Sequence, residues 1–178
     1  MKKMQALKRK KGFTLIEIIV VLVILAILVA VSLPTMFGYI EEARAKSRVQ
    51  EARVGLLAAQ WVVSEFAMTI EQVNVGEGDA ATTSRAIAVD NVLKALNREA
   101  VSDDAFPGSL TAARIRTAFE TKVEGVREPQ LAATEGAEGF SAVELAGASE
   151  DARVAGITYN DGLYTIQIVG GTTLVEKN

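Results

Sequence analysis

The clearest pattern in the sequence is an almost uninterrupted apolar run near the N-terminus. Residues 13–33 contain only three polar side chains, Thr14, Glu17 and Ser32. As an α-helix this segment is about 31 Å long, which matches the hydrocarbon thickness of a bilayer. The run is apolar on every side, and a chain of 178 residues has little core in which to bury such a helix. The pattern therefore predicts a membrane-spanning helix.

The pattern becomes amphipathic after this run and stays helical to about residue 72. Apolar side chains recur at helical spacing, with Val54, Leu57 and Trp61 stacked one turn apart. We expect this second half of a long helix, residues 35–72, to pack against a small globular head and to bury Trp61 in its core.

Pro34 and Gly38 stand where the two patterns meet. Proline has no backbone N–H to donate and disfavours helical backbone in the residue before it. Two interpretations follow: the pair ends the membrane span, or it kinks a single helix that continues beyond it. The strongly helical pattern that follows favours the kink.

The middle of the chain, residues 73–150, has a mixed pattern that predicts a partly helical segment. Apolar spacing indicates helices over residues 82–99 and 109–121. Ser109 precedes the second of these and is a candidate N-cap. Residues 125–150 are rich in Ala, Gly and Glu, which predicts a loop with one or two short elements.

The C-terminal segment, residues 151–178, alternates between apolar and polar positions and predicts a three-stranded antiparallel meander. The expected strands are residues 153–159, 163–169 and 172–176. Asn160-Asp161-Gly162 and Gly170-Gly171 supply the turns. We assign Asp161 to turn chemistry and not to a calcium site, because no cluster of Asp and Asn surrounds it. The elements together predict an α+β fold.

Charge divides the chain into two unequal parts. The net charge is −3, yet residues 1–12 contain no acid and six bases: Lys2, Lys3, Lys8, Arg9, Lys10 and Lys11. The remainder has 13 basic and 22 acidic side chains, a net charge of −9. The positive-inside rule then predicts a cytoplasmic N-terminus and a C-terminal domain on the other side of the membrane. The acidic remainder argues against direct nucleic-acid binding.

The residue types in the chain exclude several kinds of chemistry. There is no Cys and no His, so disulfides, thiol nucleophiles, imidazole bases and the commonest zinc ligands are absent. We find no phosphate-binding loop and no acid pair in a recognisable catalytic context. The charges of the C-terminal domain fit solvated faces. We therefore expect neither an enzyme nor a bound cofactor or metal.

Glu17 is the residue that a simple membrane anchor does not explain. An acid near the centre of a transmembrane segment costs about 2.5 to 3.5 kcal/mol, and less near an end. Either its carboxylate reaches back to the cytoplasmic interface, or it pairs with a positive group in apolar surroundings. An ordinary secretory signal fits poorly, because the run is too long and no small-x-small cleavage site follows.

The segment Lys11-Gly12-Phe13-Thr14-Leu15-Ile16-Glu17, the apolar run and Pro34 resemble the N-terminus of bacterial type IV prepilins and of the related type II secretion and competence pseudopilins. The resemblance covers about residues 8–60. It implies the pilin fold, a long N-terminal helix with an exposed apolar half and an amphipathic half packed on an α+β head. The implied division is a cleaved leader 1–12, a membrane and filament-core helix 13–34, an amphipathic half 35–72, a variable segment 73–150 and a β-meander 151–178.

The resemblance also implies how the chain is processed. A prepilin peptidase is expected to cut after Gly12 and to methylate the new amino group on Phe13. Glu17 would then pair with that amino group, either in a neighbouring subunit or in its own chain, and so control entry into a helical filament. The implied partners are this peptidase, identical subunits, and an inner-membrane assembly platform with its ATPase.

Three functions stay open at this point. The first is a pilus subunit, held in the cytoplasmic membrane by one span before assembly and present at the cell surface afterwards. The second is a pseudopilin of a secretion or DNA-uptake machine. The third is a monomeric membrane-anchored binding domain in which Glu17 is incidental.

Overall fold

The computed structural model describes most of the chain as two compact units. The described ranges are residues 12–73, 89–106, 110–147 and 152–178. The units are Met1–Ala43 and Arg44–Asn178, and the long helix α1 (Leu15–Val73) contributes residues to both. We call the second unit the head. Residues 1–11 of the expected leader lie outside the described ranges.

Helix α1 continues through Pro34 without interruption, so Pro34 and Gly38 do not end the helix. The polar side chains beside the proline bond within the helix. Ser32 Oγ donates to the carbonyl of Leu28 over 2.7 Å, and Thr35 Oγ1 donates to the carbonyl of Ser32 over 2.8 Å. Such local bonds satisfy hydroxyl groups in a helix that otherwise exposes apolar side chains. The kink at Pro34 and Gly38 stays a prediction.

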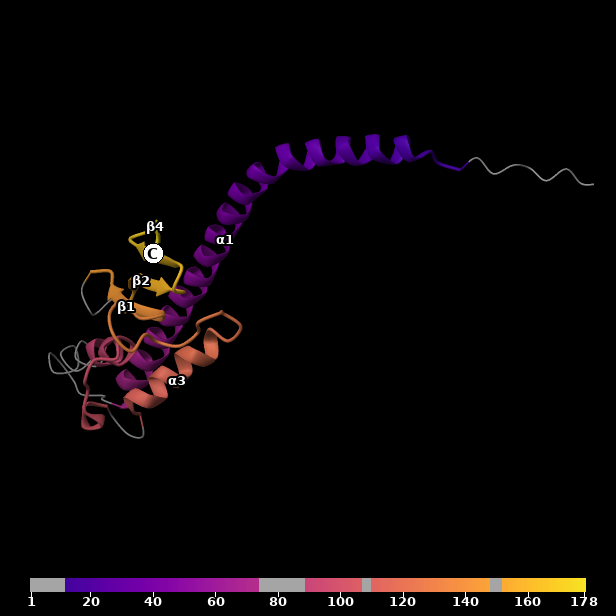
Figure 1. Ribbon diagram of the computed structural model, residues 1–178. Helices are drawn as coiled ribbons and strands as arrows, with labels where there is room; N and C mark the ends of the chain where they lie inside the picture. The colour runs from indigo at the N-terminus through magenta and orange to yellow at the C-terminus, as the bar shows by residue number, and fades with distance from the viewer. Residues whose placement is uncertain (1–11, 74–88, 107–109, 148–151) are drawn as a thin grey trace, which may run out of the picture. The chain divides into compact units, whose positions relative to one another are not determined.

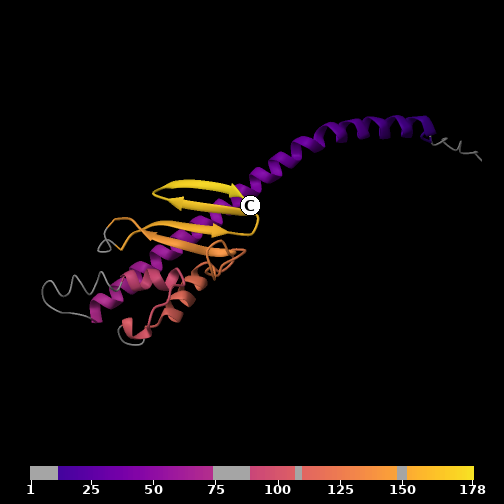
Figure 2. The ribbon, with the colours of Figure 1, turned by 60° about the vertical axis from the view of Figure 1, so that its left-hand side comes forward.

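The head contains a four-stranded antiparallel sheet in the order β1-β2-β3-β4 (Figure 2). Its strands are β1 (Gly139–Leu145), β2 (Val154–Asn160), β3 (Tyr164–Val169) and β4 (Thr172–Lys177). The last three confirm the predicted meander. The first is an additional strand in the stretch where we expected a loop with short elements.

The sequence pattern did not predict strand β1, because the backbone of this strand is irregular. Gly139 and Ala142 both have positive φ, and the register with β2 shifts between Ser141 and Glu144. A bulge of this kind breaks the alternation of buried and exposed positions by which a strand is recognised. Asn97 holds the bulge, because its side chain exchanges two hydrogen bonds with the backbone of Val143.

Short helices cover the rest of the head. Residues 89–96 are helical, which agrees with the described part of the helix expected over 82–99. A 3₁₀ turn, η1, follows at Asp103–Ala105. Helix α3 (Ala112–Lys122) begins later than predicted, and its N-cap is Thr111, whose Oγ1 accepts a bond from Arg114 N. The prediction of a helix start at Ser109 is therefore wrong, and Ser109 itself lies outside the described residues.

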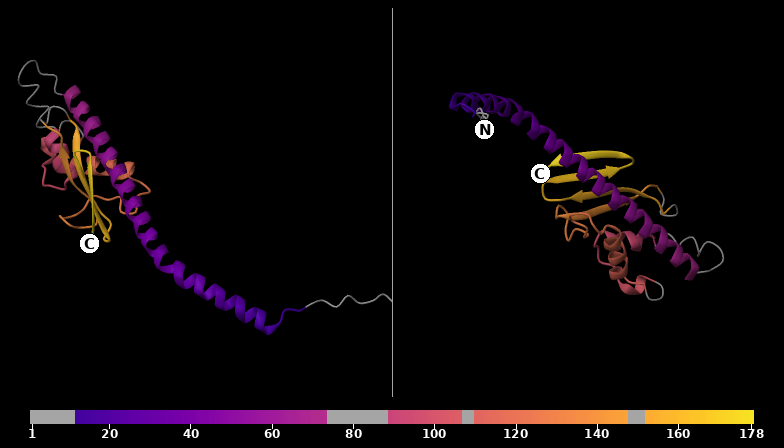
Figure 3. Two further views of the ribbon diagram at one scale, coloured as in Figure 1. Left: turned by 90° about the horizontal axis from the view of Figure 1, so that it is seen from above. Right: turned by 90° about the vertical axis from the view of Figure 1, so that its right-hand side faces the viewer.

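The part of α1 within the head lies along one face of the sheet (Figures 1 and 3). The contact uses small residues of α1. Ala52, Gly55 and Ala59 face the sheet, and the ring of Phe140 from β1 lies against Gly55. Phe140 is fully buried between Phe119, whose ring meets it edge-on at 5.4 Å, and Tyr159. The close approach explains why the core of the head needs so few large side chains from α1.

The prediction that Trp61 is a core residue is wrong. Trp61 is 40% exposed, and Val54 and Leu57 are exposed beside it. Helical spacing identified a true stripe of α1, but the sheet packs on the neighbouring stripe of small residues. Periodicity alone does not decide which of two apolar stripes on a helix is buried. A stripe of alanine and glycine is less hydrophobic than one of large side chains, but it lets the helix approach the sheet more closely.

Replacing Gly55 with alanine should destabilise the head by about 1–3 kcal/mol, because the added Cβ would overlap the immobile ring of Phe140. Gly38 is the matched control in the same helix, since a Cβ there meets nothing within 4 Å. Its replacement by alanine should be neutral or stabilising by up to about 1 kcal/mol. Urea unfolding of the detergent-solubilised chain, followed by the fluorescence of its single tryptophan, measures both. Equal effects would contradict the close contact.

Candidate functional site

The start of α1 is a reciprocal hydrogen-bonded cap. Thr14 directly precedes the first helical residue, Leu15, and Glu17 lies three positions after Thr14. Oε2 of Glu17 accepts bonds from Thr14 N and from Thr14 Oγ1, each at 2.8 Å. In return, Glu17 N donates to Thr14 Oγ1 at 3.4 Å. This is a capping box, in which the N-cap residue and the third helical residue satisfy each other's backbone N–H groups.

The capping box has particular value in an apolar environment. The first N–H groups of a helix have no partner within the helix, and an unsatisfied N–H in lipid costs several kcal/mol. Thr14 and Glu17 supply two of these partners. The sequence carries the signature of this cap, since Thr14-Leu15-Ile16-Glu17 fits the Ser/Thr-x-x-Glu pattern. The place of Glu17 in an apolar run drew attention to its charge and not to this spacing.

One oxygen of Glu17 keeps its capacity to accept a further bond. Both bonds from Thr14 end on Oε2, and Oε1 has no hydrogen-bond partner among the residues that the structure describes. The carboxylate borders a shallow, open hollow whose other walls are the side chains of Phe13, Ile16, Val20 and Val21. The arrangement offers a negative charge in apolar surroundings to a donor from outside.

The two residues before the cap are exposed and not helical. Residues 12–14 have no regular secondary structure, and Phe13 is 84% exposed. A side chain at Gly12 would meet nothing within 4 Å. The peptide bond between Gly12 and Phe13 therefore lies in open backbone, as a protease requires of a bond that it cuts.

The apolar part of α1 is uncovered along its length. Within the described residues it is the one helix long and apolar enough to cross a membrane, and none of its most apolar window is buried inside the protein. The alternative of a buried core helix is excluded by this exposure. Residues 13–33 thus present an apolar surface that needs lipid or other helices to cover it.

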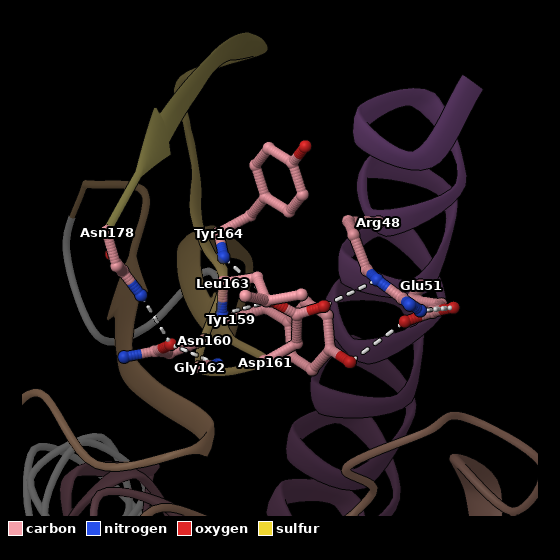
Figure 4. A network of polar contacts seen from close by, with 9 residues as sticks. All are labelled: Arg48, Glu51, Tyr159, Asn160, Asp161, Gly162, Leu163, Tyr164 and Asn178. Carbon is pink, nitrogen blue, oxygen red and sulfur yellow. Dashed lines mark hydrogen bonds and ion pairs between the residues drawn. The ribbon is translucent and has the colours of Figure 1, made fainter. Parts of the chain in front are cut away.

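A second polar arrangement connects α1 to the turn between β2 and β3 inside the head (Figure 4). Arg48 Nε lies 2.5 Å from Asp161 Oδ2, and Arg48 also pairs with Glu51 at 2.5 Å. The hydroxyl of Tyr159 donates to the second oxygen of Glu51 at 2.8 Å. Arg48 and Glu51 lie three positions apart on α1, a spacing at which helical side chains meet. No such spacing indicates the pairing with Asp161. The side chain of Asp161 is fully buried, which corrects the assignment of the charges of the C-terminal domain to solvated faces.

Asp161 also organises the turn, as predicted. Its Oδ1 accepts bonds from the backbone N–H groups of Leu163 and Tyr164. Asn160 accepts from the side chain of Asn178, so the last residue of the chain is fastened to the same turn. Figure 4 shows these bonds converging on the turn from both sides.

The network is built for stability and not for reactivity. The hydrogen bond that Arg48 donates to Glu51 raises the pKa of Arg48, and burial together with the same carboxylate raises the pKa of Tyr159. Arginine therefore stays charged and the phenol stays neutral at physiological pH. No group of three or more acidic, His or Cys side chains that could hold a metal occurs in the described part of the chain.

Comparison with known proteins agrees with the N-terminal geometry. Residues 7–33 match the family model described as the prokaryotic N-terminal methylation motif. No curated protein and no solved structure matches the chain. The matched segment includes Gly12, Phe13 and Glu17, and it ends where the apolar run ends. The chain therefore carries the prepilin-type signal of type IV pilins and pseudopilins at residues 7–33, together with the long N-terminal helix and C-terminal antiparallel sheet of the pilin fold.

Proposed function

We propose that this protein is a structural subunit of a type IV pilus. It is made as a prepilin, cleaved after Gly12, methylated on the new amino group of Phe13 and polymerised through its N-terminal helix. The observation that carries the proposal is the carboxylate of Glu17, the fifth residue after the expected cleavage site, which lies at an apolar hollow and has one oxygen without a partner among the described residues.

Cleavage creates a new positive group close to this carboxylate. The new amino group belongs to Phe13, directly before the capping residue Thr14, and an ion pair with Glu17 removes the cost of burying either charge alone. A neighbouring subunit in the correct register can supply the amino group. A misplaced subunit leaves both charges unpaired, so the pair selects one register.

The exposed apolar helix supplies the rest of the assembly. Before assembly it spans the cytoplasmic membrane, with the basic leader on the cytoplasmic side. In the filament it exchanges lipid for like helices, and contacts that repeat without closing give a helical polymer. Prepilin peptidase, identical subunits and an inner-membrane assembly platform with its ATPase are the partners that this route requires.

A pseudopilin of a type II secretion or competence machine is the alternative, because the N-terminal methylation motif is common to both kinds of subunit. Electron microscopy of sheared cells separates the two. Long surface filaments containing this chain support the pilus, whereas short assemblies within the envelope and a defect in protein export or DNA uptake support the pseudopilus.

The mass of the protein extracted from the cell envelope tests the processing. We expect a loss of residues 1–12 and a gain of one methyl group. Replacing Gly12 with valine should abolish the loss, since a branched side chain obstructs the close approach of a protease to the backbone. Gly38, which is equally open, is the matched control, and its valine variant should be processed normally. An intact N-terminus in the unmodified chain, with the peptidase active, would contradict the proposal.

A further inference from the structure

The head exposes an apolar stripe on α1 that the fold leaves uncovered. Val54, Leu57 and Trp61 lie on the side of α1 that turns away from the sheet, with exposed fractions of 42%, 69% and 40%. We call these three residues the helix stripe. An exposed leucine alone is ordinary, but three large apolar side chains at one-turn spacing make a contiguous patch.

Positive charge borders the helix stripe. Arg53 is exposed next to Val54 and has no ion pair among the residues that the structure describes. Lys122, at the end of α3, places its Nζ 3.8 Å from the centroid of the Trp61 ring. No carboxylate in the described ranges pairs with Lys122. The helix stripe is therefore an apolar surface with unpaired cations at its border.

The outer face of the sheet has the opposite character. Side chains on this face alternate with the buried ones that pack on α1, and they line a groove of about 310 Å³. Glu135 and Glu144 line this groove, its lining contains no lysine or arginine, and neither carboxylate has an ion pair in the described part of the chain. Val169 and Leu174 are exposed at its side, at 45% and 60%. We call this surface the sheet groove.

The helix stripe and the sheet groove complement each other in apolar character and in charge. Each combines large apolar side chains with charge, and the charges are opposite, which favours association and fixes its register. They cannot meet within one head, because the sheet itself lies between α1 and the groove. Contact between them requires two copies, and because the two surfaces differ, each copy can bind one neighbour through each surface.

We propose that the helix stripe of one copy binds the sheet groove of the next, with Arg53 directed toward Glu144. This inference rests on the proposed function in one respect, namely that copies of the protein come into contact with one another. It adds a head-to-head interface that is independent of the N-terminal helix and of Glu17.

Disulfide trapping in the full-length protein tests the contact, since the natural chain has no cysteine. A chain with both Leu57→Cys and Thr158→Cys should give a ladder of oligomers on oxidation, because each copy then links to two others. Either cysteine alone should give monomers only. The control pairs Leu57→Cys with Glu99→Cys, an exposed position outside both surfaces, and it should give no ladder.

Charge reversal tests the register. Arg53→Glu should reduce the ladder by about tenfold or more, because it places like charges together. Adding Glu144→Arg in the same chain should restore the ladder. Circular dichroism and Trp61 fluorescence check that each variant is folded.

Three results would overturn the inference. Folded double-cysteine protein without a ladder excludes the contact, and dimers from a single cysteine show a symmetric contact in its place. A shift of Trp61 emission on anionic phospholipid vesicles, without a ladder, assigns the helix stripe to a membrane surface. The mass test keeps the hypotheses separate: a processed subunit without a ladder contradicts only this inference, whereas an unprocessed one contradicts the proposed function.

Discussion

Replacing Asp161 with asparagine is expected to lower the free energy of unfolding by about 2–4 kcal/mol, because it breaks a buried ion pair and leaves the other partner in place. The asparagine oxygen can still accept the turn bonds from Leu163 and Tyr164, so the turn is kept. The charge is lost, and an NH2 donor replaces the oxygen that faces Arg48 Nε. Arg48 Nε makes no hydrogen bond among the described residues, so its contact with Asp161 Oδ2 is one of charge alone. The guanidinium retains Glu51, which keeps the loss below that of an isolated buried charge.

The pair between Asp90 and Lys94 is the matched control for this experiment. Its side chains are 54% and 41% exposed, so solvent screens the attraction. Asp90→Asn should change stability by less than about 1 kcal/mol. Urea unfolding of the full chain, followed by Trp61 fluorescence, compares the two variants. A loss for Asp161→Asn no larger than that for Asp90→Asn would mean that the α1-to-turn pair contributes nothing net to the head.

The features that were predicted correctly from the sequence depend on neighbouring residues. The apolar run, which forms the first part of α1, is contiguous, and the C-terminal strands alternate regularly between defined turns. Gly170 and Gly171 both have positive φ, as the predicted turn requires. Local patterns of this kind need no knowledge of the tertiary structure.

The features that escaped prediction depend on contacts between distant residues. Nothing in the neighbourhood of Asp161 identifies Arg48, more than a hundred positions earlier, as its partner. The position of Trp61 was wrong for a similar reason, because the choice between two stripes of α1 is made by Phe140 of β1 pressing against Gly55. Strand β1, which supplies that ring, was itself hidden by its bulge.

The sequence around Glu17 is consistent with two roles for this one side chain. Its spacing from Thr14 encodes a helix cap, and its place in an apolar run suggests an ion pair with an external amine. The structure makes these roles compatible, because the cap uses one carboxylate oxygen and leaves the other. The roles are also separable, since glutamine preserves the acceptor of the cap and removes the charge.

Glu17→Gln is expected to insert normally into the membrane and to fail in filament assembly. Insertion is not impaired, because the variant removes a charge that costs about 2.5 to 3.5 kcal/mol near the centre of the span and less near its end. Assembly leaves the Phe13 amino group without a carboxylate in an apolar core. An α-amino group has a pKa of about 8 in water, so losing its proton at pH 7 costs about 1.4 kcal/mol, a tenfold penalty for each added subunit. Raising the pH to about 9 should then restore part of the yield.

Comparison with two further variants assigns the effect to charge or to capping. Thr14→Ala keeps the carboxylate and removes the hydroxyl that caps α1, at a cost of about 1 kcal/mol to the helix start, and it should still assemble. Glu17→Ala removes both functions and should fail at every pH more severely than the glutamine variant. Sheared-filament yield against the amount in the membrane fraction measures all three. Normal filaments from Glu17→Gln would exclude the ion pair. An equal loss from Thr14→Ala would make the capping box, and not the charge, the reason that this chain keeps an acid at the start of its membrane helix.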